Sequence, residues 1–410
     1  MPRYTLVVAD ILREKRIVLG VTGSIAAYKA VGLASALTQA GALADVVMTR
    51  EALELVRPLS FQAITHRPVS FELFSMLAET EIGHVSLGKS ADAVLIAPCT
   101  ANTLAKLSYG LADDILTTTV LATEAPLIIA PAMDAGMYEH PAVQENVGRL
   151  KQRGVVFVEP QEGYLASGLR GSGRLADQET ILGTLRATLG QSGDLAGAHV
   201  VVTAGGTEEP IDPVRYISNR SSGKMGYALV EAARDRGANV TLIHAPTGLL
   251  DPVGATCVAV TSAEDMYQAV KSSYRTADVL IMAAAVADFR PATAAGQKIK
   301  KRDAELTLEL EPTVDILSAT MRCEQYPIRV GFAAETTKLS EYAREKVRAK
   351  RLDLIVANDV SRADSGFGTD TNLVSIITAS GEVIECPLMS KRDVADIVLD
   401  QVVAIRSGRR

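Results

Sequence analysis

The sequence predicts an α/β protein that contains two domains with mainly parallel sheets. Short runs rich in Val, Ile and Leu alternate with helical stretches, which is typical of βαβ units. A strand that ends in a glycine turn ahead of a helix occurs near the start of the chain and again near its middle. The 410 residues exceed the roughly 250 to 300 that one apolar core usually serves, so we expect two domains.

The N-terminal half opens with IVLGVTGSIAAYK, residues 17–29, which predicts a strand, a tight turn and a helix. Gly41 is a plausible stop for this helix, and residues 44–48 predict the next strand. Further apolar runs predict the remaining strands of the sheet, at residues 93–97, 127–130 and 155–158.

A glycine-rich stretch, GQSGDLAG at residues 190–197, predicts the interdomain linker because it loses the apolar period. We therefore expect one domain over residues 1–190 and another over residues 191–410. In the second, residues 198–207 predict a strand and glycine turn, and residues 226–243 a helix and strand. The chain then reads as two Rossmann-like domains in tandem, each with its own phosphate-turn candidate.

Composition argues against several classes of protein. The formal charge is −6 with acids and bases interspersed, so we expect no nucleic acid and no membrane surface as partner. No run reaches about 18 apolar residues, and we expect neither a signal peptide nor a membrane span. The four cysteines are scattered, which predicts no zinc site, no disulfide framework and a cytoplasmic location.

The first glycine turn contains Gly20, Gly23 and Ser24. Such a turn directs backbone N–H groups and a helix N-terminus toward an anionic phosphate, from a flavin or another nucleotide. The pattern GxxGS is shorter than GxGxxG and lacks a ribose-binding acid at the expected place, so a plain structural turn fits it equally well.

Polar residues also follow the buried run at 93–97. Thr100, Asn102 and Thr103 come directly after Pro98 and ahead of a helix. The carboxyl ends of parallel strands are where such sheets bind ligands, although helix capping alone would explain either Thr100 or Asn102.

Together with GSIAAYK, GHVSLGKSADAVLIAP and PAMDAGMY, this segment resembles the homo-oligomeric flavin-containing cysteine decarboxylases over about residues 13–180. The resemblance implies FMN as cofactor and a trimer that shares each active site between subunits. It implies that His84 is the active-site histidine. It also implies four positions near the flavin: Gly23, Ser24, Thr100 and Asn102.

Two catalytic positions depart from that family. Asp134 stands where PxMN has the asparagine that holds the substrate carboxylate, and Ser167 stands where the substrate flap has a cysteine. An ionised Asp134 about 4 Å from a carboxylate would be repelled by roughly 4 kcal/mol at an effective dielectric near 20. A serine hydroxyl is also a far weaker acid than a thiol.

Three hypotheses follow for this half. It decarboxylates the family substrate with other groups, it acts on a different thiol, or it is a flavin-binding assembly scaffold. The retained flavin turns, His84, and the glycine-rich flap with Arg170 and Arg174 favour retained decarboxylation.

The C-terminal half contains GGTEEPIDPVRYISNRSSGKMG, residues 205–226, with a polar cluster over residues 219–224 ahead of a helix. Backbone and side-chain donors at a helix N-terminus suit phosphates. A solvated, capped loop is the alternative, but so long a polar loop between apolar elements favours a function.

Two further segments carry charge. Residues 283–291, AAAVADFRP, lead a strand into Asp288, and KIKK follows at residues 298–301. A carboxylate can accept the exocyclic amine of cytosine, and lysines suit a triphosphate. Alone, KIKK is also compatible with a solvated charge run.

With GFAAET and ANDV, these segments resemble the phosphopantothenate–cysteine ligases over about residues 194–405. The resemblance implies that the substrate carboxylate attacks the α-phosphate of CTP and that the cysteine amine then displaces CMP. It implies cytosine recognition by Asp288, α-phosphate stabilisation by Lys298 and a hold on the acyl-cytidylate by Asn219. Phe332 and, in reserve, Lys300 complete the nucleotide contacts. We expect Mg²⁺ on phosphates and water, without a protein cage.

The order of the two halves resembles the fused, bifunctional CoaBC/Dfp family. This implies coenzyme A biosynthesis: 4′-phosphopantothenate, L-cysteine and CTP give 4′-phosphopantothenoylcysteine, which is decarboxylated to 4′-phosphopantetheine. If the decarboxylase domains form trimers and the ligase domains form dimers, closed symmetry satisfies both contacts only in a larger homo-oligomer such as a dodecamer.

Overall fold

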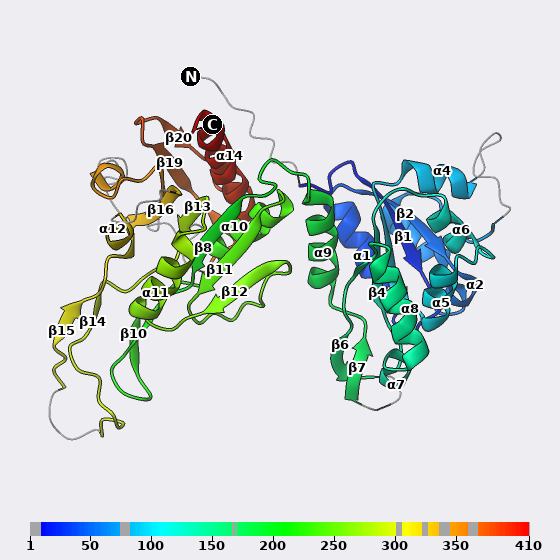
Figure 1. Cartoon of the computed structure of the whole chain (residues 1–410), viewed down its shortest axis with the longest axis horizontal. Helices are drawn as coiled ribbons and strands as arrows, with labels where there is room; N and C mark the ends of the chain where they lie inside the picture. The colour runs from blue at the N-terminus through cyan, green and yellow to red at the C-terminus, as the bar shows by residue number, and fades with distance from the viewer. Residues whose placement is uncertain are drawn as a thin grey trace. The chain divides into compact units, whose positions relative to one another are not determined.

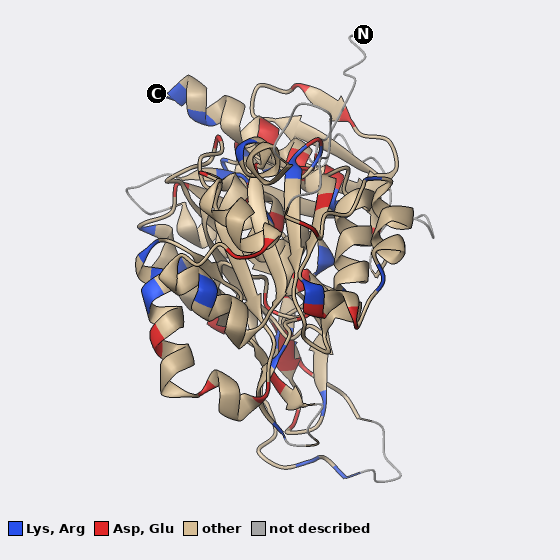
Figure 2. Cartoon of the chain, turned by 90° about the vertical axis from the view of Figure 1, so that its right-hand side faces the viewer, with Lys and Arg blue, Asp and Glu red and all other residues tan. Residues whose placement is uncertain are grey.

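The computed structural model describes residues 10–73, 83–165, 168, 170–300, 306–321, 327–335, 345–359 and 368–409. The chain divides after Gly190 into two compact units, each of which is an α/β sandwich (Figure 1). Over the described residues, helices are too short or too polar to cross a bilayer. Figure 2 shows basic and acidic residues interspersed along the chain, in keeping with its composition.

The N-terminal unit is built on a five-stranded, wholly parallel sheet in the order β2-β1-β3-β4-β5. Its strands are the β-branched runs expected from the sequence: β1 (Arg16–Val21), β2 (Leu43–Met48), β3 (Ala93–Cys99), β4 (Leu127–Pro131) and β5 (Val156–Phe157). All seven residues of β3 are buried, as a central strand covered on both faces requires.

Helices cover both faces of this sheet. Because strand side chains alternate, Leu19 packs with one helix layer and Val18 with the other. The first layer contains α1 (Ala27–Gln39), α3 (Pro58–Thr65) and α9 (Gln178–Gly190). The second contains α4 (Gly83–Ser90), α5 (Ala101–Tyr109), α6 (Ile115–Leu121) and α8 (Pro141–Gln152). Short elements complete the unit: α2 (Arg50–Leu53), α7 (Ala135–Tyr138) and the hairpin β6 (Gln161–Tyr164)–β7 (Arg170–Arg174).

The C-terminal unit contains an eight-stranded sheet in the order β12-β11-β8-β13-β16-β17-β19-β20. The first six strands are parallel and the last two antiparallel. In chain order they are β8 (His199–Ala204), β11 (Asn239–His244), β12 (Ala255–Ala259), β13 (Val279–Met282), β16 (Ile328–Glu335), β17 (Leu354–Asp359), β19 (Val374–Thr378) and β20 (Val383–Glu385).

One face of this sheet packs on α10 (Lys224–Asp235) and α14 (Lys391–Arg409), and the other on α11 (Ala263–Tyr274) and α12 (Ile316–Thr320). Three short antiparallel pairs lie outside the main sheet: β9 (Glu208–Pro210) with β10 (Tyr216–Ser218), β14 (Phe289–Pro291) with β15 (Leu310–Pro312), and β18 (Thr371–Asn372) with β21 (Met389–Ser390).

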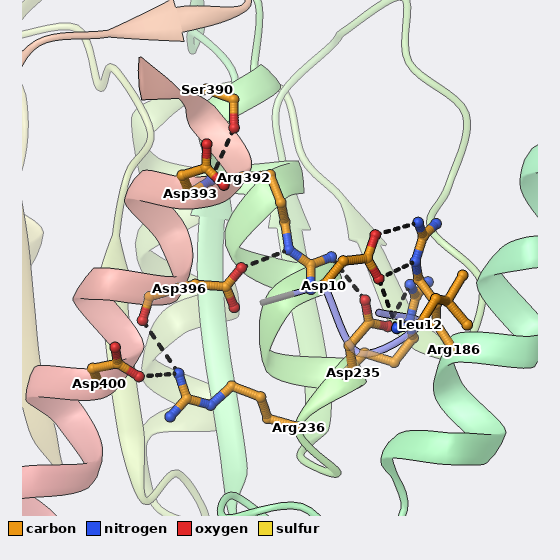
Figure 3. A network of polar contacts seen from close by, with 11 residues as sticks. Asp10, Leu12, Arg186, Asp235, Arg236, Ser390, Arg392, Asp393, Asp396 and Asp400 are labelled. Carbon is orange, nitrogen blue, oxygen red and sulfur yellow. Dashed lines mark hydrogen bonds and ion pairs between the residues drawn. The ribbon is translucent and has the colours of Figure 1, made fainter. Parts of the chain in front are cut away.

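A buried ionic network joins α10 to α14 (Figure 3). Asp235, whose side chain is 1% exposed, accepts from Arg234 at 2.7 Å and from Arg392 at 2.7 Å. Burial opposes the charge of Arg392, but Asp235 and Asp396 raise the pKa of its guanidinium. The network therefore holds the two helices of one layer in register.

The fold class expected from the sequence is confirmed. In both sheets the strand order reverses beside the first strand of the unit, between β1 and β3 and between β8 and β13. Such a reversal opens a crevice at the carboxyl ends of the strands, where α/β sheets bind ligands.

Candidate active sites

A cavity of about 570 Å³ lies at the carboxyl edge of the N-terminal sheet. Segments that follow β1, β3 and β4 line it together with the β6–β7 hairpin. Its volume falls within the range of small-molecule and cofactor sites. Gly23, Ser24, Thr100 and Asp134, all named from the sequence, are among its lining residues.

The turn after β1 is shaped by close contacts. A Cβ atom on Gly23 would lie 2.3 Å from Glu51 Cβ, so this position accepts only glycine without a backbone shift. The Ser24 hydroxyl donates to the Ala132 carbonyl at 3.1 Å and thereby joins the turn to the segment after β4.

Thr100 has two roles in this edge of the sheet. Its hydroxyl oxygen caps α5 by accepting from Thr103 N at 3.3 Å, and its residue also lines the cavity. Asn102, the second residue of α5, is exposed and is not among the lining residues. The structure thus brings Thr100, but not Asn102, to this cavity.

Asp134 caps α7. Its Oδ1 accepts from Gly136 N at 3.1 Å, a contact that an asparagine oxygen would make equally well. The neighbouring Met133 N–H donates to Gly173 O at 3.0 Å, which ties the β6–β7 hairpin to this loop. Asp134 therefore makes a capping contact that an asparagine could also make, and it adds a negative charge to the cavity lining.

Two cationic side chains line the same cavity, Lys29 from α1 and Arg174 from β7. Burial, followed by the positive charge of Arg174, lowers the pKa of Lys29. Lys29 was not singled out from the sequence, where it looks like a solvated helix residue one turn after Ser24. Paired cations beside a glycine turn suit an anionic ligand.

His84 is not brought into this cavity. His84 is the second residue of α4, is absent from the lining, and has a buried Nδ1 without a hydrogen-bond partner among the described residues. Ser167 lies outside the described residues. Both assignments stay predictions.

A second cavity, of about 140 Å³, lies at the carboxyl edge of the C-terminal sheet. The N-terminal residues of α10, the loop after β13, and side chains from β16, β17 and α14 line it. Phe332, named from the sequence, is one of them. Gly223 precedes α10 with φ of 77°, and a Cβ there would lie 2.7 Å from Thr247.

Asn219 joins the two loops that flank the switch point of this sheet. Its Nδ2 donates to the carbonyls of Ala285 at 3.2 Å and Val286 at 3.1 Å. These carbonyls precede Asp288, which is exposed two residues further on. Lys298 and Lys300 are also exposed and lie outside the cavity lining.

The rim of the second cavity carries two lysines that pair with the segment before β18. Lys224 contacts Asp370 at 2.6 Å, and the buried Lys391 donates to the carbonyls of Thr369 at 2.5 Å and Thr371 at 3.3 Å. Burial and the charge of Lys224 lower the pKa of Lys391 to about 8. Sequence reasoning missed Lys391, because only the tertiary fold brings it near α10.

The described residues contain no group of three or more His, Cys, Asp or Glu side chains able to hold a metal ion. Any divalent cation bound through such a group would have to involve other parts of the chain or a ligand.

Comparison with known proteins follows the same division. Residues 8–190 match the Flavoprotein family, and residues 195–405 match the DNA/pantothenate metabolism flavoprotein C-terminal domain. The coenzyme A biosynthesis bifunctional protein CoaBC of Bacillus subtilis (strain 168) is 48% identical over 404 residues, 97% of this chain and 100% of that protein. The protein of the same name from Escherichia coli (strain K12) is 43% identical, over 96% of this chain and 97% of its own.

The chain belongs to the CoaBC family of bifunctional coenzyme A biosynthesis proteins. Family membership confirms the resemblance seen in the sequence and the expectation of a bifunctional enzyme with ligase and decarboxylase halves.

Two solved structures show similarity to parts of this chain. The C-terminal domain of a CoaBC protein is 42% identical, with 53% of this chain and 100% of that chain covered and a TM-score of 0.46. A mutant PPC decarboxylase complexed with pantothenoylaminoethenethiol is 32% identical, with 42% and 97% covered and a TM-score of 0.39.

Proposed function

We propose that residues 191–410 join 4′-phosphopantothenate to L-cysteine with CTP, and that residues 1–190 decarboxylate the product, 4′-phosphopantothenoylcysteine, to 4′-phosphopantetheine. The observation that carries this proposal is the placement of expected site residues at both switch points: Gly23, Ser24 and Thr100 in one unit, Asn219 in the other. Whole-length similarity to CoaBC proteins supports the pairing of the two activities.

The ligase reaction begins when a carboxylate oxygen of 4′-phosphopantothenate attacks the α-phosphorus of CTP and pyrophosphate leaves. The cysteine amine then attacks the acyl carbon of the acyl-cytidylate, CMP leaves, and the amine loses a proton. Lys298 would stabilise charge on the α-phosphate and Asp288 would accept the cytosine amine. Mg²⁺ enters with the triphosphate, bound through phosphate oxygens and water.

Asn219 has a defined part in this scheme. Its amide nitrogen already joins its own loop to the backbone at Ala285 and Val286. The backbone around an acyl-cytidylate bound between these loops would therefore be fixed in position. A fixed position of the intermediate favours attack by the amine over loss of the intermediate.

The N-terminal cavity fits FMN in volume, in its place at the switch point and in its donors. Gly23, Ser24 and Thr100 would hold this cofactor, which would supply reversible two-electron oxidation of the substrate thiol. Lys29 and Arg174 place positive charge beside a phosphate or the substrate carboxylate, and offset the charge of Asp134. His84 is the group that moves a proton at the substrate.

A second copy of the chain would supply His84. Its position outside the cavity of its own chain supports a site shared between subunits. Four exposed apolar side chains among the lining residues, Ile25, Tyr28, Met137 and Tyr164, are also suited to a protein contact. We infer trimeric decarboxylase cores and, with dimeric ligase domains, a dodecamer in the cytoplasm.

The position of Asp134 favours the two alternatives for the N-terminal unit. Because its carboxylate lines the cavity, the N-terminal unit remains a candidate for another thiol substrate, or for a flavin-binding scaffold.

Mass-spectrometric analysis of products tests the proposal. The purified protein receives 4′-phosphopantothenate, L-cysteine, CTP and Mg²⁺. Formation of 4′-phosphopantetheine and CMP is the expected result. Accumulation of 4′-phosphopantothenoylcysteine would refute decarboxylation by residues 1–190. Accumulation of the oxidised enethiol would show that carbon dioxide is lost but that the final reduction to 4′-phosphopantetheine fails, and absence of CMP would refute the ligase assignment.

A further inference from the structure

One carboxylate joins the tip of the β9–β10 hairpin to the lysine segment that follows β14. The Asp212 side chain has no solvent exposure. It accepts from the backbone N–H groups of Val214 and Arg215, each at 2.9 Å, and from the Arg215 guanidinium at 2.5 and 3.0 Å. Its Oδ2 also accepts from Ile299 N at 3.1 Å, 87 residues further along the chain.

Ile299 is held at both of its backbone polar groups. While Asp212 accepts its N–H, Arg215 Nη2 donates to its carbonyl at 2.8 Å. Four residues earlier, Ala295 N donates to Ile211 O at 2.9 Å. The hairpin tip therefore contacts residues 295–299 at three backbone groups.

Lys298 and Lys300 flank Ile299, and both side chains are exposed. A lysine ammonium sits on a flexible four-carbon stem, so its reach depends on where its Cα is held. Fixing Ile299 fixes the backbone one residue from Lys298. At the base of the same hairpin, Asn219 holds the loop that leads to Asp288.

The ionised state of Asp212 is maintained by its surroundings. The Arg215 guanidinium and the backbone N–H groups of Val214, Ile299 and Arg215 hold the pKa of Asp212 well below its usual range. The three-way contact between Asp212, Arg215 and Ile299 is therefore present throughout the range of pH in which enzymes are assayed.

We propose that Asp212 is a positioning residue for the ligase: it touches no substrate, and with Arg215 it fixes Ile299 so that Lys298 meets the α-phosphate of CTP. This inference rests on the proposed ligase function. If Asp212 only stabilised the turn at residues 212–215, its replacement would leave kcat unchanged.

The test measures steady-state release of pyrophosphate by the full-length protein from CTP, 4′-phosphopantothenate and saturating L-cysteine. Asp212→Asn is expected to lower kcat about 10- to 100-fold, with KM for CTP changed less than about threefold, because misplacement by about 1 Å has effects of this size. The Ile299 amide should exchange hydrogen faster, while the melting temperature stays near that of the wild type.

Asp265→Asn is the matched control. Asp265 also accepts a backbone N–H, from Ser262 at 3.0 Å, but it does so in the capping box of α11. Its variant should keep the wild-type kcat. Wild-type protein without CTP-dependent pyrophosphate release would sink the ligase assignment itself, whereas active wild type and an equally active Asp212→Asn variant would overturn only the role of Asp212.

A second pair of variants leaves the Asp212–Arg215 turn intact. Ile299→Pro removes the N–H that Asp212 accepts, and Ile299→Val retains it. Of these two variants, we expect only Ile299→Pro to have a lower kcat. Asp212→Asn should cause no further loss when it is combined with Ile299→Pro. If the fold-loss of kcat in the double variant equalled the product of the losses in the two single variants, Asp212 would act elsewhere and the inference would be overturned.

Discussion

Asp134 shows how one residue preserves local geometry and alters chemistry. Its oxygen caps α7 through a contact that an asparagine oxygen could also make, but its charge lines the cavity together with Lys29 and Arg174. The effective charge at this point therefore depends on three side chains, one of which, Lys29, attracts no attention in the sequence.

Asp134→Asn tests this balance. Asparagine keeps the cap and removes the negative charge, so KM for 4′-phosphopantothenoylcysteine should fall by about tenfold, a modest part of the roughly 4 kcal/mol that two carboxylates at 4 Å would give at an effective dielectric near 20. Steady-state decarboxylation with isolated 4′-phosphopantothenoylcysteine provides the measurement. A higher KM in the variant would mean that Asp134 binds the substrate through its charge.

Lys298 and Asn219 should separate the two ligase steps. Lys298→Gln is expected to lower pyrophosphate release by about 100- to 1,000-fold, the usual effect of removing one group that stabilises transition-state charge. Lys271→Gln, at an exposed position of α11 outside the lining of the C-terminal cavity, provides the control and should retain wild-type release. Wild-type release from Lys298→Gln would remove this residue from its role.

Asn219→Asp should instead slow the step after cytidylate formation. The change replaces an amide that donates to two carbonyls with a carboxylate that they repel. Acyl-cytidylate should therefore accumulate when cysteine is present, which quench-flow mass spectrometry detects. Normal turnover with no such accumulation would contradict the assignment.

At the scale of elements, apolar runs predicted the strands of the N-terminal sheet and, in the C-terminal unit, β8, α10 and β11. Strands β12, β16, β17 and β19 were not predicted, and the strand expected within residues 283–291 lies earlier, as β13 at Val279–Met282. The antiparallel pairs β6–β7, β9–β10 and β14–β15 were not predicted, because sequences such as QEGY and EEP show no alternation of apolar and polar residues. Such short strands are stabilised by the loops on which they pack. These same hairpins supply Arg174 and Asp212 to the site edges.

The ionic network between α10 and α14 gives a stability prediction. Asp235→Ala leaves the buried Arg234 and the part-buried Arg392 without their shared partner, and should destabilise the C-terminal unit by about 3 kcal/mol. Asp194→Ala removes a half-exposed carboxylate from Arg236, which keeps its pair with Asp400, and should change stability by about 0–1 kcal/mol. Urea unfolding followed by circular dichroism gives both values, and equal effects would argue against a special role for burial.

At the scale of the whole molecule, a shared decarboxylase site predicts complementation between chains. His84→Asn and Ser24→Trp chains should each be inactive in decarboxylation. Co-expressed, they form some interfaces in which an intact histidine meets an intact cavity, and random mixing should restore roughly one quarter of the activity. The control is the His84→Asn, Ser24→Trp double variant expressed by itself, which should stay inactive because no interface contains an intact histidine or an intact cavity. No recovery in genuine hybrids would show that each site is complete within one chain.

The sequence by itself determined the α/β class, the sequence positions of the glycine turns and the family, because β-branched runs, glycine and long motifs are local signals. Gly23, Ser24 and Thr100 follow predicted strands, whose carboxyl ends lie at a sheet edge, and Asn219 belongs to a long polar loop; the family resemblance implied their roles, which stay predictions. Only the tertiary structure decided which side chains lie together at each sheet edge. It placed Lys29 beside Arg174, Lys391 beside the N-terminus of α10, and Asp212 against Ile299. These contacts join residues far apart in sequence, and a single charged side chain looks the same in sequence whether it faces solvent or lines a site.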